Sequence, residues 1–182
     1  GIKVGIIGVM TIDALRATLR VNVQGLRTAP LADVVTAEAK KLRAAGAEVV
    51  IVGSHAGGSC AEFGEPTDLS SCDANAEMFQ VARAVPRGLI AVIVAGHTHQ
   101  ALAHEVEGVA IIQAYAQGRF FSRVDVAFDR RKQRVVGHEL MAPRELCTVQ
   151  DPLTLSCEAP VASKVPLPPA HYEGRVVTPD AA

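Results

Sequence analysis

Short apolar runs alternate with amphipathic stretches over the first half of the chain. Three continuous apolar runs predict buried strands, at Ile2–Val9, Glu48–Val52 and Leu89–Ala95. Between them, Leu31–Ala45 has the apolar spacing of a helix, which Gly46 is expected to end. A second helix is expected from about Asp73, whose carboxylate can cap the first turn, to Val85. This alternation predicts a parallel sheet with helices on both faces.

The pattern changes after His99, where short strands alternate with glycine-containing or charged turns. These strands are expected at Val109–Gln113, Arg123–Phe128 and Val135–Leu140, and they favour antiparallel or mixed pairing. Beyond Pro143 the sequence is rich in proline and has no regular pattern. We therefore expect one α/β domain over residues 1–182, with a core at 1–143 and an irregular C-terminal segment at 144–182.

Both ends suggest that the domain is incomplete. The chain starts with Gly1, and the apolar run of a buried strand follows at once, so it starts inside a fold. At the other end, Tyr172–Asp180 stops where a Pro-Asp pair would ordinarily open a helix. We expect the chain to be part of a longer protein.

Composition narrows the classes of partner. A length of 182 residues is enough for one domain with a sizeable core. The 18 basic and 19 acidic residues leave no positive charge excess of the kind that nucleic-acid binding requires. No apolar run reaches the roughly 18 to 20 residues of a membrane span. A small-molecule or protein-binding role fits better.

Four cysteines form two local pairs in loop-like sequence, Cys60 with Cys72 and Cys147 with Cys157. No Cys-x-x-Cys spacing of a structural zinc site is present. The spacing favours two loop disulfides and hence a periplasmic or secreted location, whereas four free thiols in a cytosolic enzyme are the alternative.

Histidines follow two of the predicted strands directly. Gly96-His97-Thr98-His99 follows one strand, and Gly53-Ser54-His55 follows the strand before it. Ligand groups in open α/β sheets gather at the carboxyl ends of strands, so His55, His97 and His99 are expected to converge on metal. Imidazole suits zinc, manganese, iron, cobalt or nickel. A single strand-end histidine is more often a structural or surface residue, and it is the His-x-His spacing that makes metal binding the better interpretation.

Four segments together resemble the calcineurin-like metallophosphoesterases, and most closely their bacterial 5'-nucleotidase and cyclic-nucleotide phosphodiesterase branch. These segments are Lys3–Gly8, Ser54–Gly58, Ile93–His99 and Gln113–Phe120. The resemblance runs from Gly1 to about Pro143 and covers only the C-terminal part of the catalytic domain. It implies an α/β sandwich of parallel-to-mixed sheets flanked by helices.

The resemblance also implies a chemistry. Members of this family use two divalent ions, of which zinc, manganese, iron, cobalt and calcium all remain candidates here, to hydrolyse nucleotides or other small phosphate esters. Carried over by position, His55 and His97 would bind one ion and His99 the other. Tyr115–Phe120 would form a loop near the substrate, or else a purely structural turn.

Several family elements have no counterpart in this sequence. The Asp-x-His motif, the Gly-Asp that supplies a bridging carboxylate, and the Asn-His that contacts phosphate are all missing. We therefore expect a phosphoesterase as the parent protein and an inactive isolated chain. Two alternatives stay open, a non-catalytic metallophosphoesterase-like binding module and a mononuclear zinc protein that uses all three histidines.

Overall fold

A five-stranded mixed sheet forms the centre of the computed structural model, which describes residues 1–146, 171–172 and 174–176. The strands are β1 (Val4–Met10), β2 (Val49–His55), β3 (Val92–Val94), β4 (Ala101–Val106) and β5 (Val109–Ala114), in the order β1-β2-β3-β5-β4. All neighbouring pairs are parallel except β4 with β5. The predicted α/β class and mixed pairing are confirmed, although β4 had no counterpart among the predicted strands.

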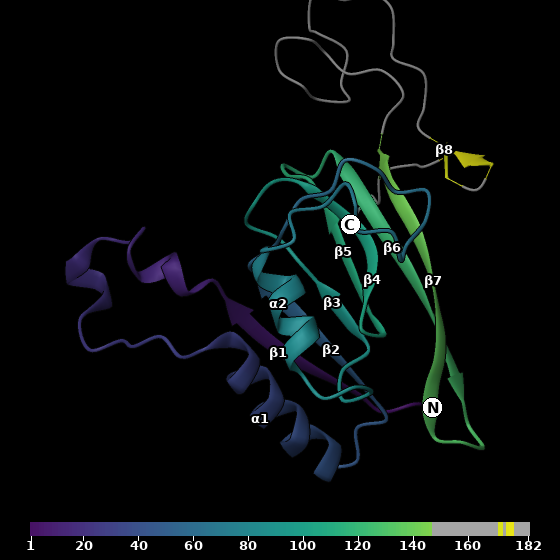
Figure 1. Cartoon of the computed structure of the whole chain (residues 1–182), viewed down its shortest axis with the longest axis horizontal. Coiled ribbons are helices and arrows are strands. Elements are labelled where there is room, and N and C mark those ends of the chain that lie inside the picture. The colour runs from purple at the N-terminus through teal and green to yellow at the C-terminus, as the bar shows by residue number, and fades with distance from the viewer. Residues whose placement is uncertain (147–170, 173, 177–182) are drawn as a thin grey trace, which may run out of the picture.

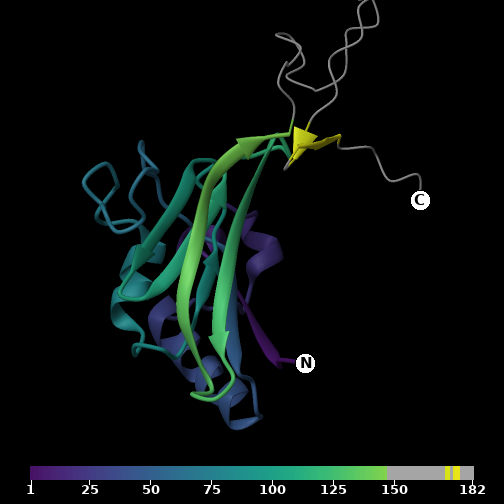
Figure 2. The same ribbon diagram turned by 90° about the vertical axis from the view of Figure 1, so that its right-hand side faces the viewer.

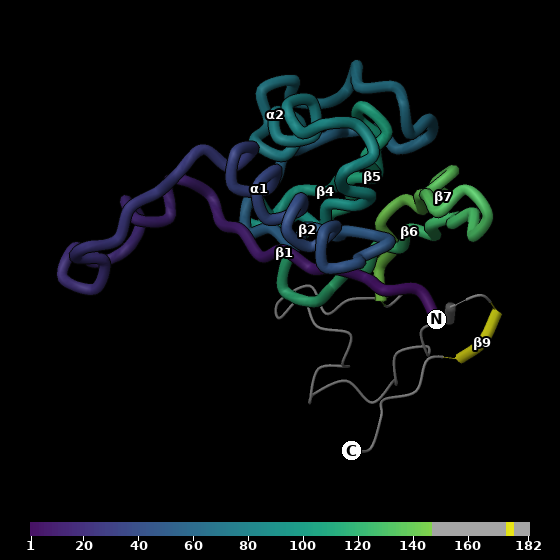
Figure 3. The backbone as a smooth tube through the Cα atoms, turned by 90° about the horizontal axis from the view of Figure 1, so that it is seen from below, coloured from purple at the N-terminus to yellow at the C-terminus, as the bar shows by residue number. Residues whose placement is uncertain are grey.

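One face of the sheet carries the helices α1 (Leu31–Ala44) and α2 (Glu77–Ala84) (Figures 1 and 3). The main core lies between them and the sheet, and its largest fully buried side chains include Phe79, Met78, Ile93 and Leu102. Gly5 lets α1 approach β1, because a Cβ there would lie 2.9 Å from Leu42 Cδ1.

The other face is covered by a hairpin of β6 (Phe120–Asp129) and β7 (Arg134–Glu145), seen in front in Figure 2. Apolar side chains of the hairpin, including Val124, Val126 and Leu140, pack against Val49 and Val92 of the sheet. The expectation of helices on both faces is therefore wrong. The long alternating strands around the turn at 130–133 pair with each other and bury their inward residues on the sheet.

Local backbone contacts explain where α2 starts and where α1 ends. The predicted start of α2 at about Asp73 is wrong, because the helix begins at Glu77. Asp73 Oδ1 accepts the backbone N–H of Asn75 at 2.9 Å, so this carboxylate closes a turn four residues before the helix begins. Gly46, at a φ of +94°, ends α1 as predicted, and its N–H donates to the Arg43 carbonyl at 3.0 Å.

Two further differences concern the C-terminal part. Strand β7 continues past Pro143 to Glu145, and a separate two-stranded sheet of β8 (His171–Tyr172) and β9 (Arg175–Val176) lies inside the segment expected to be irregular. The predicted Cys147–Cys157 disulfide lies outside the described residues. None of the described helices has the length and apolar character that crossing a membrane requires.

A long loop between β2 and α2 is closed by a Cys60–Cys72 disulfide, as predicted. The two cysteines face each other as an isolated antiparallel bridge, and the Cys60 N–H donates to the Ala101 carbonyl of β4 at 3.2 Å. The disulfide therefore fixes the loop on the edge strand of the sheet.

Replacing both cysteines of this loop by serine should lower the free energy of unfolding by about 2 to 3 kcal/mol, because the open loop gains chain entropy in the unfolded state. Urea unfolding in EDTA checks this, in a background where Cys147 and Cys157 are already serine. Dithiothreitol should destabilise the background protein by a similar amount and leave the fourfold variant unchanged. Equal stability of the two proteins under oxidising conditions would contradict the prediction.

Candidate metal centre

The carboxyl ends of β1, β2 and β3 bring two of the three predicted histidines together. His55 is the last residue of β2, and His97 follows β3 by three residues. His97 Nδ1 lies 3.1 Å from His55 Nε2, and the ring centroids are 4.7 Å apart. Both side chains are exposed, so the pair opens to solvent.

His99 is placed differently. It is exposed, and it does not join the pair in any group whose ligand atoms all lie within 4.8 Å of one another. Among the described residues, no Cys, Asp or Glu completes such a group with His55 and His97 either. The structure thus brings together one pair of imidazoles and leaves the third apart.

The loop that carries His97 and His99 has an unusual backbone. His97 has a φ of +74° and His99 a φ of +56°, a left-handed conformation that costs a residue other than glycine on the order of 1 kcal/mol or more. Such conformations persist only where neighbouring contacts enforce them, and they gather at functional sites. Four other described residues that are not glycine, Glu107, Tyr115, Gln117 and Gln133, also have a positive φ, so the backbone supports the candidate site and does not identify it alone.

Hydrogen bonds to Thr98 and Gln113 hold this loop in place. Thr98 Oγ1 donates to the Gly58 carbonyl at 2.7 Å and accepts from Gln113 Nε2 at 2.7 Å. The same amide nitrogen donates to the Gln100 carbonyl at 2.8 Å. Gln113 is only 2% exposed, so its bonds form inside the protein. Neither Thr98 nor Gln113 was predicted to have a role from the sequence. A glutamine at the end of an apolar strand does, however, indicate a buried polar group that needs hydrogen-bond partners.

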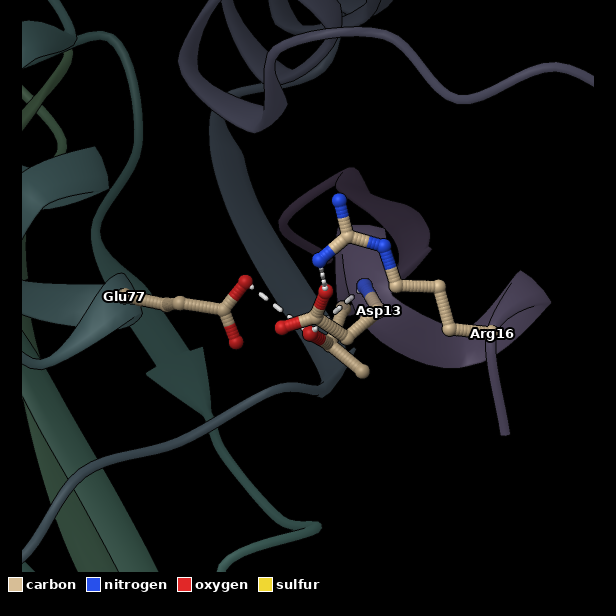
Figure 4. A network of polar contacts seen from close by, with 4 residues as sticks. Asp13, Arg16 and Glu77 are labelled. Carbon is tan, nitrogen blue, oxygen red and sulfur yellow. Dashed lines mark hydrogen bonds and ion pairs between the residues drawn. The ribbon is translucent and has the colours of Figure 1, made fainter.

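A second polar network fixes the end of β1 next to His55. The Thr11 N–H donates to the His55 carbonyl at 2.9 Å, and Thr11 Oγ1 donates to Glu77 Oε1 at 3.0 Å. Figure 4 shows Glu77 reaching from α2 toward this network, with Asp13 paired to Arg16 on its other side. Both carboxylates are already engaged in these contacts, which position the strand end.

Two other segments near the site are the long loop between β2 and α2 and the predicted loop Tyr115–Phe120. In the long loop, Asp68 closes a local turn, because its Oδ1 accepts the Ser70 N–H at 2.9 Å. Tyr115 stacks on Phe120 with centroids 4.4 Å apart, and Gln117 has a φ of +63°. The loop around them borders a cavity of about 340 Å³ that also reaches Val94 and Ser122. The segment predicted as either a substrate loop or a structural turn therefore does line a cavity near the exit of β3.

The donor set of the histidine pair fits a divalent ion. Two imidazole nitrogens bound to one ion at about 2.0 to 2.1 Å lie roughly 2.9 to 3.4 Å apart, depending on the coordination angle. The His97–His55 separation of 3.1 Å is within that range and is also the length of a hydrogen bond between the two rings, which an ion would replace. A carboxylate that bridges this ion to a second one would have to come from outside the histidine pair, because no described carboxylate forms a compact group with it.

Comparison with known proteins gives a match in structure alone. No family model and no curated protein matches the sequence. A putative 5'-nucleotidase from Staphylococcus aureus matches with a TM-score of 0.57 at 21% identity, over 76% of this chain and 27% of its own. Calcineurin-like phosphoesterase YfkN from Bacillus subtilis matches with a TM-score of 0.56 at 17% identity, over 79% and 43%.

A third match has a similar fold and is named for a different activity. Sulfate thiohydrolase SoxB from Thermus thermophilus has a TM-score of 0.55 at 18% identity, over 76% of this chain and 22% of its own. In all three comparisons the chain spans less than half of the length of the structure that it matches. The chain has the fold of part of a calcineurin-like metallophosphoesterase domain.

Proposed function

We propose that this chain supplies part of the metal site of a longer hydrolase that cleaves phosphate esters. The single observation that carries the proposal is the contact of His55 with His97 at adjacent strand ends, at a separation suited to one shared ion. The likeness in fold to a putative 5'-nucleotidase and to a calcineurin-like phosphoesterase supports the same class of reaction. A nucleotide or a related small phosphate ester is the proposed substrate. Residues 1–182 are proposed to form one incomplete domain.

Each histidine has a proposed role in this site. His55 and His97 hold one divalent ion, and His99, which stands apart from them, contributes to a second. Bound divalent ions would polarise the phosphate and supply a nucleophilic hydroxide. Thr98 and Gln113 orient the loop, because their hydrogen bonds hold it at Thr98, between the two histidines, and at Gln100, directly after them. The cavity beside Tyr115 is the proposed place for the remainder of the substrate.

The isolated chain should not turn over substrate. Stabilising the charge of a phosphoryl transition state needs metal ions held by several ligands, and the described residues offer no carboxylate within reach of the histidine pair. This absence favours a fragment of an enzyme, or a binding module, over a complete catalyst. A mononuclear zinc site with all three histidines is disfavoured, because His99 does not join the pair.

The disulfide also supports a proposal for where the protein is located. The Cys60–Cys72 disulfide favours an oxidising compartment, so we propose a periplasmic or secreted protein.

Hydrolysis of p-nitrophenyl phosphate and of bis-p-nitrophenyl phosphate in Mn²⁺ tests the proposed function. The protein encoded by the full open reading frame should turn over one of them, and its His97→Ala variant should lose at least about 100-fold in kcat/KM, since removing a ligand costs at least as much as removing a residue behind it. The 182-residue chain should be inactive. An active His97→Ala protein would contradict the role of the pair, and an active isolated chain would contradict its incompleteness.

A further inference from the structure

The disulfide-closed loop between β2 and α2 lies directly over a buried histidine of β4. Besides the bond from the Cys60 N–H to Ala101, the loop accepts the Glu105 N–H at the Pro66 carbonyl, at 2.8 Å. These two backbone contacts flank His104 on both sides along the strand. His104 itself is only 1% exposed, so the loop and the sheet enclose its imidazole.

His104 and the two cysteines form a compact group of ligand atoms. One ring nitrogen of His104 and the Sγ atoms of Cys60 and Cys72 all lie within 4.8 Å of one another. Among the described residues, this is the one group of three His, Cys, Asp or Glu side chains that is so compact. It is more compact than any group around the predicted metal ligands His55, His97 and His99.

The environment of His104 suits a metal ligand. Its Nδ1 accepts the Ala103 N–H at 3.3 Å, and the Phe63 ring lies 5.9 Å away between centroids. Burial lowers the pKa of His104, against a hydrogen bond of the ring to the Glu62 backbone and the charge of Asp68, which raise it, and the lowered pKa favours the neutral imidazole that binds metal. The ring nitrogen that binds the ion has to give up its bond to either Ala103 or Glu62. Both cysteines are only partly buried, so a reductant in solution has access to their sulfurs.

We propose that Cys60, Cys72 and His104 form a second metal site, which opens when the Cys60–Cys72 disulfide is reduced. A dithiol reductant gives two electrons and two protons to the disulfide and leaves as its own disulfide, so Cys60 and Cys72 become thiols. Zn²⁺, or another cation that prefers sulfur, then displaces the two thiol protons to solvent. The resulting set of two thiolates and one imidazole leaves a fourth position for water.

The backbone needs little change to accept the ion. Thiolates and an imidazole bound to zinc at about 2.3 and 2.0 to 2.1 Å place their ligand atoms roughly 3.3 to 3.8 Å apart. The two sulfurs, which are bonded to each other in the disulfide, have to separate to that distance, whereas the His104 nitrogen already lies within 4.8 Å of both. The Cα atoms of Cys60 and Cys72 are 4.0 Å apart, so side-chain rotation provides most of the movement. The backbone bonds to β4 can persist, and the metal replaces the disulfide as the closure of the loop.

Co²⁺ titration of the reduced chain tests this site, because thiolate–Co²⁺ bonds give a charge-transfer band in the near ultraviolet. The protein carries Cys147→Ser and Cys157→Ser, and it is reduced with dithiothreitol and desalted without oxygen. We expect the band at one equivalent of Co²⁺, its loss on adding Zn²⁺, and no band from the oxidised protein. Absence of the band in the reduced protein at excess Co²⁺ would overturn the proposal.

Variants separate this site from the strand-end histidines. His104→Gln should weaken Co²⁺ binding at least about 10-fold, and His97→Ala should leave the band unchanged. An unchanged titration in His104→Gln would remove His104 from the site and overturn the three-ligand proposal. Should His104→Gln fail to fold by circular dichroism, Cys72→Ser provides the second test, since one remaining thiolate should give about half of the band. A full band in Cys72→Ser would overturn the proposal equally.

Discussion

Replacing Phe79 by alanine should lower the free energy of unfolding by about 3 to 5 kcal/mol, the largest stability effect expected of the substitutions considered. Phe79 is 0% exposed and lies on α2 in the middle of the core between the helices and the sheet. Alanine removes most of this packing and leaves a cavity, because the surrounding strands cannot collapse into it.

Urea unfolding followed by far-ultraviolet circular dichroism measures this effect. Lys40→Ala is a matched control, because Lys40 is an exposed residue in the other helix, and it should change stability by less than about 0.5 kcal/mol. A loss below about 1 kcal/mol in Phe79→Ala would show that α2 does not pack on the sheet as described.

Replacing Gly57 by alanine should cost about 3 kcal/mol and disturb the metal centre as well. A Cβ at Gly57 would overlap Gln113 Oε1 and the Gly96 carbonyl oxygen, and it would come within 3.0 Å of Thr98 Oγ1. Because one of these neighbours is a backbone carbonyl and another is a buried amide whose nitrogen is held by two hydrogen bonds, the loop that carries His97 has to move. Both the free energy of unfolding and the affinity for Mn²⁺ should therefore fall.

Gly64→Ala is the matched control for this substitution. Gly64 lies in the same connection between β2 and α2, and nothing lies within 4 Å of the Cβ that alanine would add there. This variant should keep both stability and Mn²⁺ affinity. A Gly57→Ala protein as stable as Gly64→Ala would contradict the close approach of the two loops.

The sequence pattern predicted those helices and strands whose position is determined by a local run of apolar residues or by a single glycine. Continuous apolar runs located β1, β2 and β3, and Gly46 located the end of α1, because these signals are local. The hairpin of β6 and β7 was predicted as strands, but the pattern carries no information on which face it covers. Strand β4 was missed because Ala101–Val106 includes His104 and Glu105, polar residues that are covered by distant segments, His104 by the long loop and Glu105 by His138 of the hairpin.

The sequence also predicted only part of the candidate site. His55 and His97 were expected to meet because parallel strand ends share one edge of the sheet, and they do lie together. His99 does not join them in a compact group, and the left-handed backbone conformations of His97 and His99 could not be read from their spacing. The contact of His104 with the disulfide pair was not foreseen, since it joins residues more than 30 positions apart through a loop without periodicity.

Calorimetric titration of this chain with Mn²⁺ and Zn²⁺ under oxidising conditions tests the central claim, that His55 and His97 hold a divalent ion. We expect one weak site, whose affinity falls more than about 10-fold in His97→Ala. Binding should persist in Lys40→Ala, which removes an exposed side chain of α1. Binding that is unchanged in His97→Ala would contradict the claim, and two tight sites would show that the chain already holds a complete metal centre.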